Sequence, residues 1–154
     1  MKILFICTHN RCRSILAEAI ANHYGAGLIE AFSAGSEPSG IIHPITLLQL
    51  QNHQIPTHNL KSQSWDDFEQ YQADIIITVC DKAAAEPCPL WFGDAQQIHW
   101  GLSDPSAVIG SEEEINAAFT KTISILKGRI QQVKSWLGQG IDKASLHQRI
   151  AALA

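Results

Sequence analysis

The chain has 154 residues, so we expect a single domain over residues 1–154. Its 15 acidic and 11 basic residues give a net charge of −4, which argues against general binding of nucleic acid or of a membrane surface. No apolar stretch approaches the roughly 20 residues that span a bilayer and the N-terminal apolar run is too short for a signal peptide, so we expect a cytoplasmic protein with reduced cysteines.

Short apolar runs alternate with helical patterns along the chain. The run at residues 73–80 is the clearest buried strand, because it contains three isoleucines and a valine. In chain order the pattern predicts a strand at 2–7, a helix at 14–24, a strand at 28–34, helices at 43–52 and 65–71, strands at 73–80 and 97–102, a long helix ending at Gly138 and a short helix at 141–154.

The long helix is the strongest of the helical predictions. Ser111 and Glu114 have the spacing of a capping box, and apolar residues then recur every three or four positions up to Leu137. Strands that alternate with helices favour right-handed crossovers and parallel pairing. We therefore predict an α/β fold, a three-layer sandwich in which a four-stranded parallel sheet carries helices on both faces.

The residues directly after the first strand read C-T-H-N-R-C-R-S. In open α/β sheets, ligands bind where a strand ends and a helix begins, and a loop there directs several backbone N–H groups into one concavity. Arg13 adds a planar guanidinium group that can hold two oxygens of a tetrahedral oxyanion. Asn10 tolerates a left-handed backbone and can hold the loop in shape. The pattern predicts a pocket for a phosphate-sized anion.

Cys7 lies at the floor of this predicted pocket. The N–H groups, the helix end and Arg13 favour the charged form of a sulfur placed there, so we expect a lowered pKa and a thiolate nucleophile. The Ser14 hydroxyl can donate to the same sulfur. A buried, inert thiol is the alternative for an isolated cysteine, but a Cys-x5-Arg-Ser spacing between a strand and a helix favours the catalytic interpretation.

The stretch C-T-H-N-R-C-R-S-I-L-A-E resembles the N-terminal loop of low-molecular-weight protein tyrosine phosphatases and of the arsenate reductases that share their fold. The similarity continues in S-A-G at 33–35, D-I-I-I-T-V-C at 74–80 and D-P at 104–105, and it covers about residues 1–137. The resemblance implies that residues 8–14 bind the oxyanion, namely Thr8, His9, Asn10, Arg11, Cys12, Arg13 and Ser14.

Two further cysteines favour the reductase branch. Cys80 ends a parallel strand and therefore lies at the same sheet edge as Cys7, and Cys88 follows it closely. Reduction of arsenate takes two electrons, which two thiols supply when they form a disulfide, whereas a phosphatase needs one thiolate and one acid. The resemblance implies that Cys7 attacks arsenate, Cys80 attacks Cys7, Cys88 attacks Cys80, and Asp104 serves as general acid.

Two alternatives remain open at this stage. A phosphatase would need Cys7, Arg13 and Asp104 alone, although Ser106 stands where the phosphatases usually carry an aromatic residue after Asp-Pro. A non-catalytic anion-binding or thiol-sensing module would bind without turnover. For Cys12, packing is the favoured role and pairing with Cys7 the lesser one.

The expected partners follow from the reductase interpretation. They are an arsenate or phosphate oxyanion and an external thiol reductant, either thioredoxin or glutaredoxin with glutathione. The seven histidines lack the spacing of metal ligands, so we predict no metal centre and no bound cofactor. We expect a monomer or a weak dimer.

Overall fold

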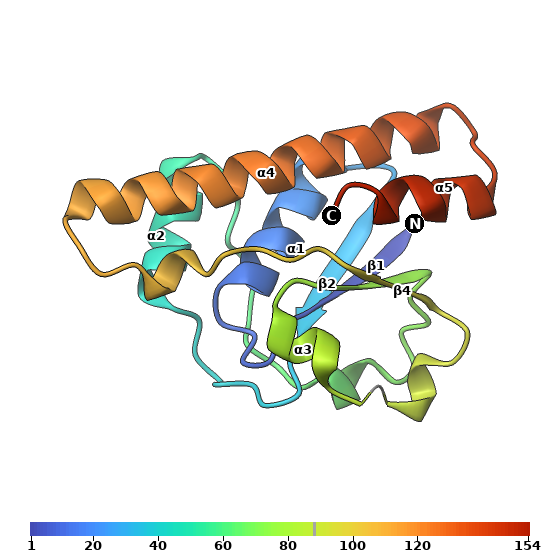
Figure 1. The fold of residues 1–154 in the computed structure, drawn as a ribbon, viewed down its shortest axis with the longest axis horizontal. Coiled ribbons are helices and arrows are strands. Elements are labelled where there is room, and N and C mark those ends of the chain that lie inside the picture. The colour runs from blue at the N-terminus through green and yellow to red at the C-terminus, as the bar shows by residue number, and fades with distance from the viewer. Residues whose placement is uncertain (88) are drawn as a thin grey trace.

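The central element of the fold is a parallel sheet of four strands, as predicted. The computed structural model describes residues 1–87 and 89–154. The strands are β1 (Lys2–Ile6), β2 (Glu30–Ala34), β3 (Ile75–Thr78) and β4 (Gln96–His99), in the order β2-β1-β3-β4 with every pairing parallel (Figure 1). The α/β fold class is confirmed.

The strand order places a switch point beside β1. The chain leaves β1 to form β2 on one side and later returns to form β3 on the other. Ile6, the last residue of β1, pairs with Thr78, the last residue of β3. Cys7 and Cys80 therefore follow neighbouring strands at one edge of the sheet, where open α/β folds bind their ligands.

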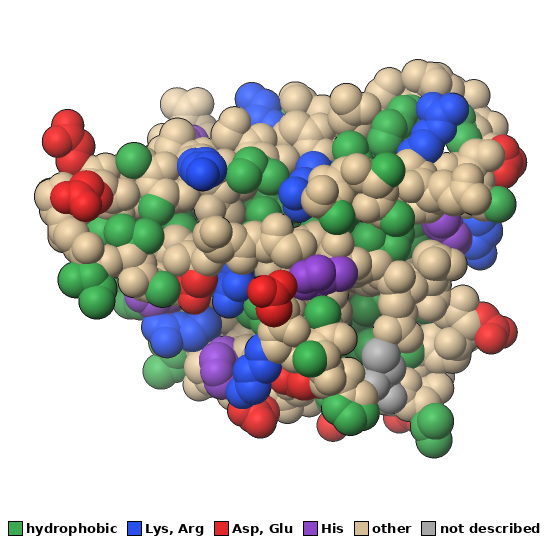
Figure 2. Space-filling model, viewed as in Figure 1, with side chains coloured by type: hydrophobic (Ala, Val, Ile, Leu, Met, Phe, Trp, Pro, Cys, Tyr) green, Lys and Arg blue, Asp and Glu red, His purple; other side chains and the backbone are tan. Residues whose placement is uncertain are grey.

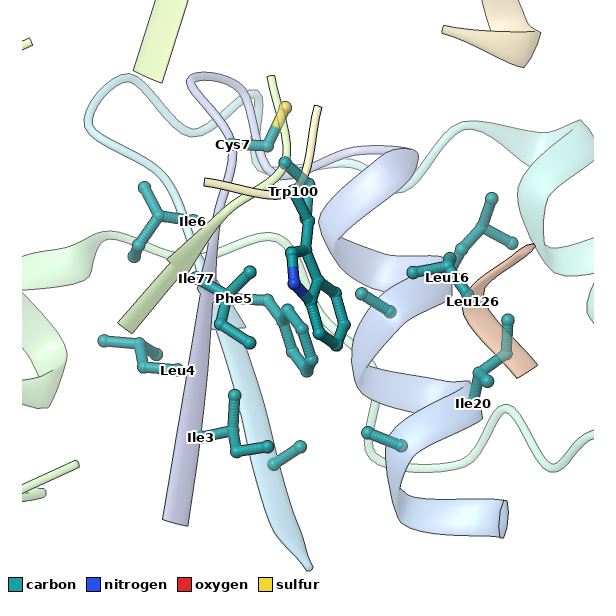
Figure 3. Close-up of a cluster of buried hydrophobic side chains, with 14 of the residues drawn as sticks. Ile3, Leu4, Phe5, Ile6, Cys7, Leu16, Ile20, Ile77, Trp100 and Leu126 are labelled. Carbon is teal, nitrogen blue, oxygen red and sulfur yellow. The ribbon is translucent and has the colours of Figure 1, made fainter. Parts of the chain in front are cut away.

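One face of the sheet is covered by α-helices from the N-terminal and C-terminal parts of the chain. These are α1 (Arg13–Tyr24), α4 (Glu112–Gly138) and α5 (Lys143–Ala151); α1 and α5 pack against α4 (Figure 1). In Figure 3, Phe5 and Trp100 lie on the side of the sheet that faces Leu16, Ile20 and Leu126. Successive residues of β1 are fully buried, which shows that both of its faces are covered.

The opposite face is covered by shorter elements. They are η1 (Trp65–Phe68), α3 (Asp81–Ala85) and η2 (Leu90–Phe92), and the rings of Trp65 and Phe92 meet there. Phe68 lies 5.4 Å from Phe32 between ring centroids, and Trp65 lies 5.7 Å from Phe92. The helix predicted at residues 65–71 is thus a single 3₁₀ turn, because aromatic packing rather than a helical stripe fills this layer.

The remaining elements connect the sheet to the helical layer. They are α2 (Pro44–Asn52), which packs on α1 and α4, and the 3₁₀ turn η3 (Pro105–Ala107) before α4. The capping box at Ser111 and Glu114 is present as predicted. Within the described residues, none of the helices has the length and apolar content needed to cross a membrane.

Trp100 joins the end of β4 to the C-terminal helix. Its indole is fully buried, and Nε1 donates a hydrogen bond to the Ile150 carbonyl at 2.9 Å. The Arg129 guanidinium of α4 stacks over the same ring at 5.3 Å from its centroid. Helix α5 is therefore held to the sheet by a specific polar contact as well as by apolar packing.

Candidate active site

The loop between β1 and α1 turns its carbonyl oxygens away from the pocket. Three of them accept hydrogen bonds from backbone N–H groups of the segment 37–43: Thr8 from Glu37 at 2.9 Å, His9 from Ser39 at 3.0 Å and Arg11 from His43 at 3.0 Å. Because a trans peptide directs its N–H opposite to its carbonyl, the N–H groups that follow these carbonyls face the other way. The loop thus forms a cradle of donors suited to an oxyanion.

Asn10 is the residue that holds the loop together. Its backbone φ is +45°, which is the left-handed conformation predicted for this position. Its buried side-chain amide donates to Ser14 Oγ at 2.8 Å and Ser33 Oγ at 2.9 Å, and its oxygen accepts from the Gln63 N–H at 2.9 Å. Asn10 therefore links the loop to α1, β2 and the segment before η1.

Gly35 allows β2 to pass directly beside the loop. A Cβ atom at this position would collide with the Thr8 carbonyl oxygen and would lie 2.7 Å from that of Cys7. The S-A-G motif identified in the sequence thus has two structural uses. Ser33 supports Asn10, and Gly35 leaves room for the loop backbone.

Arg13, at the first position of α1, is oriented by the segment after β4. Its Nη1 donates to the Leu102 carbonyl at 2.9 Å, and its Nη2 lies 3.7 Å from Asp104 Oδ2. Asp104 Oδ1 accepts from the Ser106 backbone N–H at 2.9 Å and from its hydroxyl at 2.6 Å. The structure therefore brings the predicted Arg13 and Asp104 together at the cradle and fixes one oxygen of the carboxylate.

Cys7 and Cys80, both predicted to react, lie side by side in the structure. Their side chains are in hydrogen-bonding contact at the ends of β1 and β3, and both are buried. Cys80 Sγ also accepts the Ala83 N–H of α3 at 3.4 Å. Figure 3 shows the Cys7 sulfur directed away from the apolar core, at the end of β1.

The pKa of Cys7 is raised in the structure, whereas the sequence predicts that it is lowered. The hydrogen bond with Cys80 and burial raise the pKa of Cys7, and together they outweigh Arg13, which lowers it. The same hydrogen bond from Cys7 lowers the pKa of Cys80 to about 5. The prediction of a low pKa for Cys7 is wrong in this structure, because the contact with Cys80 and burial raise it while the pKa of Cys80 falls.

Of the other two cysteines, Cys12 and Cys88, the structure describes only Cys12. Cys12, the residue before α1, is buried, and burial raises its pKa to about 11, so it is a neutral thiol at pH 7. Thr46 and Ser106 lie beside its sulfur and partly offset the effect of burial on its pKa, which agrees with a packing role. Cys88, predicted to be the third redox thiol, lies outside the described residues.

Glu86 is a residue of the site that the sequence did not single out. The Thr8 hydroxyl donates to its Oε1 at 2.9 Å and lies 3.8 Å from Cys80 Sγ. Its Oε2 is buried without a hydrogen-bond partner among the described residues. The only signal in the sequence is that Glu86 directly follows an alanine run between the two predicted redox cysteines.

Glu18 of α1 is a second buried carboxylate close to the loop. Burial raises its pKa to about 7, although hydrogen bonds from Ser33 act in the opposite direction. Its Oε1 has no hydrogen-bond partner within the described part of the chain. Across residues 1–87 and 89–154, no group of three or more His, Cys, Asp or Glu side chains is arranged to hold a metal ion.

The surface charge is mixed rather than concentrated. On the face shown in Figure 2, Lys and Arg side chains lie among Asp, Glu and His side chains. A net charge of −4 gives no overall attraction for anions. An anion at the loop would therefore be attracted by local groups, such as the Arg13 guanidinium, rather than by the overall charge.

Comparisons with known proteins agree with this geometry. The pattern of the family described as low molecular weight phosphotyrosine protein phosphatase matches residues 2–145. The chain is 32% identical over 130 residues to an arsenate reductase of Bacillus subtilis strain 168, covering 84% of this chain and 92% of that protein.

Two solved structures are similar along most of the chain. An arsenate reductase in its phosphate-binding state matches with a TM-score of 0.70 and 26% identity, over 88% of this chain and 98% of that one. The thioredoxin-dependent arsenate reductase of Corynebacterium glutamicum matches with a TM-score of 0.68 and 25% identity, over 91% of this chain and 63% of that one. With the family pattern spanning almost the whole sequence, the chain belongs to the low molecular weight phosphotyrosine protein phosphatase family.

Proposed function

We propose that the protein is an arsenate reductase, which reduces arsenate to arsenite with electrons from its own thiols. The observation that carries the proposal is the contact between Cys7 and Cys80 at the oxyanion cradle. A phosphatase has no use for a second thiol there, whereas a two-electron reduction needs one. The similarity to the Bacillus subtilis arsenate reductase supports the same activity.

The reaction begins with nucleophilic attack by Cys7. The Cys7 thiolate attacks the arsenic atom, an arsenate oxygen leaves as water after protonation, and a sulfur–arsenic bond forms. The Cys80 thiolate then attacks the Cys7 sulfur. A sulfur–sulfur bond forms, the sulfur–arsenic bond breaks, and its electron pair stays on arsenic, which leaves as arsenite. Two thiols are oxidised and one arsenic atom is reduced by two electrons.

The groups around Cys7 have separate roles in this proposal. Arg13 binds two oxygens of the oxyanion, together with the N–H groups of residues 8–14. The attack needs Cys7 as a thiolate, which forms when the Cys7 proton passes to the Cys80 thiolate; the charge of Arg13 favours this transfer because it lowers the pKa of Cys7. Cys80 gives the proton up to solvent before the second step. Asp104 lies 3.7 Å from Arg13 and is the candidate to protonate the leaving oxygen.

Regeneration requires a third thiol and an external reductant. Cys88 attacks Cys80, which frees Cys7 as a thiolate and leaves a disulfide between Cys80 and Cys88. A dithiol protein such as thioredoxin, or glutaredoxin with glutathione, then reduces that disulfide; the Corynebacterium glutamicum relative is thioredoxin-dependent. We place the reaction in the cytoplasm, where protein thiols are kept reduced.

Hydrolysis of phosphate monoesters is the second candidate function. It is favoured by the family match and by the presence of Cys7, Arg13 and Asp104, which suffice for a phosphocysteine intermediate. Arsenate and phosphate are both tetrahedral oxyanions, so one cradle can accept either. The two functions differ in whether Cys80 takes part.

A thiol count separates the two functions. Fully reduced protein is treated with arsenate in the absence of any reductant, and arsenite is assayed in the same sample. We expect a loss of two thiols per chain and one arsenite per chain, whereas phosphate in place of arsenate changes neither. An unchanged thiol count without arsenite, while a chromogenic phosphate ester is still hydrolysed, would establish the phosphatase instead.

A further inference from the structure

Thr8 lies between two groups that compete for its hydroxyl hydrogen. Its oxygen is 2.9 Å from Glu86 Oε1 and 3.8 Å from Cys80 Sγ, and the residue is almost fully buried. A threonine hydroxyl has a single hydrogen, so it donates to one of these partners at a time. The shorter distance and the charge of the carboxylate direct that hydrogen to Glu86.

This competition has a direct consequence for Cys80. The Thr8 side chain helps to lower the pKa of Cys80, but while its single hydrogen is donated to Glu86 it stabilises the thiolate less than a hydroxyl that donates to the sulfur would. If Glu86 is absent or protonated, the hydroxyl is free to turn and donate to the sulfur. The negative charge of Glu86 acts in the same direction, because like charges in a buried cluster resist each other.

We propose that Glu86 restrains the nucleophilicity of Cys80 by holding the hydroxyl hydrogen of Thr8 away from the sulfur. Glu86 acts through Thr8 and is therefore a positioning residue for the second step of the reaction. The role of Glu86 in turnover rests on the proposed function. Its effect on the pKa of Cys80 does not require arsenate.

The neighbouring titratable groups are held by other partners. Asp81 of α3 pairs with His99 of β4 at 2.9 Å, and Lys82 pairs with Glu37 at 3.8 Å. Cys7 contacts Cys80 from the end of β1. His99 also lines the small hollow beneath α3 that Glu86 borders. Of the described contacts to the Thr8 hydroxyl, Glu86 makes the only one from a carboxylate.

The test measures the reactivity of Cys80 against pH in the full-length, reduced protein. The protein is treated with iodoacetamide at a series of pH values, and alkylation of the peptide that contains Cys80 is followed by mass spectrometry. Glu86→Gln removes the charge and keeps the size of the side chain. Glu37→Gln is the matched control, because Glu37 is an acidic neighbour of α3 whose carboxylate pairs with Lys82 rather than with Thr8.

We expect Glu86→Gln to shift the pH midpoint of Cys80 alkylation downward by about one unit, which is about a tenfold faster reaction below the midpoint. Glu37→Gln should keep the wild-type midpoint. An unchanged or raised midpoint in Glu86→Gln overturns the proposal. Glu86→Ala removes the same carboxylate and should shift the midpoint in the same direction, so the outcome does not depend on one variant folding.

A double-mutant cycle tests the route through Thr8. Thr8→Val keeps the shape of the side chain and removes the hydroxyl, so the Glu86→Gln shift should largely disappear in that background. A shift of full size there would mean that Glu86 acts on Cys80 by its field alone and would refute the hydrogen-bond mechanism. Arsenite assays on wild-type protein run in parallel: their failure would reject the proposed function without changing the alkylation result.

Discussion

Cys7 and Cys80 follow adjacent parallel strands, and each side chain lies close enough to shift the pKa of the other, upward for Cys7 and downward for Cys80. The contact exists in the structure without any bound anion. It also means that the two thiols titrate as a pair, in which the first proton is lost easily and the second is retained.

The first prediction concerns the second thiol. Cys80→Ser should abolish arsenite release, because a serine hydroxyl cannot form the disulfide that expels arsenite. Hydrolysis of a chromogenic phosphate ester should persist, since it requires Cys7 and no second thiol. Both activities are measured on the same preparation, and full arsenite turnover in Cys80→Ser would contradict the proposed reaction.

The second prediction concerns the acidity of Cys7. Its hydrogen bond with Cys80 is the largest cause of the raised pKa of Cys7, so Cys80→Ala should lower that pKa. The thiolate of Cys7 then forms at lower pH, and the acidic limb of the pH profile for phosphate ester hydrolysis should move downward. Cys12→Ala is the control, because Cys12 is a separate buried thiol. A profile that moves to higher pH would show that Cys80 does not hold the charge of the pair.

The third prediction concerns the stability of the loop. Asn10→Ala leaves several buried partners unpaired and places alanine at a φ of +45°, so the free energy of unfolding should fall by about 2–4 kcal/mol. Asn10→Gly accepts the backbone conformation and should recover about 1 kcal/mol of that loss. Denaturant unfolding measures both variants. Equal stability of the two would mean that the left-handed backbone carries no strain.

The fourth prediction concerns Glu18, whose pKa burial raises to about 7. The Glu18 carboxyl stays protonated to a higher pH in the folded state than in the unfolded state. Its contribution to the free energy of unfolding therefore falls as pH rises from about 4.5 to 7 and is constant above that range. Glu18→Gln removes this loss and should be more stable than the wild type at pH 8, by up to about 3 kcal/mol, with a smaller difference at pH 5. Denaturant unfolding at the two pH values checks the sign, and a difference that is independent of pH would contradict it.

The fifth prediction concerns the attachment of α5. Trp100→Phe removes the 2.9 Å hydrogen bond to Ile150 and leaves a void in the core, which should cost about 2–4 kcal/mol. Trp65→Phe, at a partly buried position of η1 that packs on Phe92, is the control and should cost less. Thermal unfolding gives the stability, and limited proteolysis should show faster loss of the C-terminal helix in Trp100→Phe alone.

The sheet was predictable because its strands are short, apolar and rich in β-branched residues. The strand expected at residues 73–80 is observed as Ile75–Thr78, and the long helix ends at Gly138 as its apolar pattern indicates. The turn Trp65–Phe68 was less predictable, since its aromatic side chains are placed by contacts with β2 and η2 rather than by a local period.

The site was predictable in its residues but less so in its electrostatics. The loop motif identified Cys7 and Arg13, and the sheet edge placed Cys80 beside them. The raised pKa of Cys7 depends on a contact between two strands, and the contact of Thr8 with Glu86 depends on how the segment after β3 folds back. Such pairings through space leave no regular pattern in one sequence.

The geometry of the anion cradle depends on Gly35, a residue that has no reactive side chain. Any side chain at this position would collide with the carbonyl oxygens of Cys7 and Thr8. The loop backbone would have to shift, and its N–H groups would no longer point toward one site. A substitution there would leave every cysteine and arginine in the chain intact. The protein would keep the side chains of the proposed reaction but lose the loop geometry needed to bind a tetrahedral oxyanion.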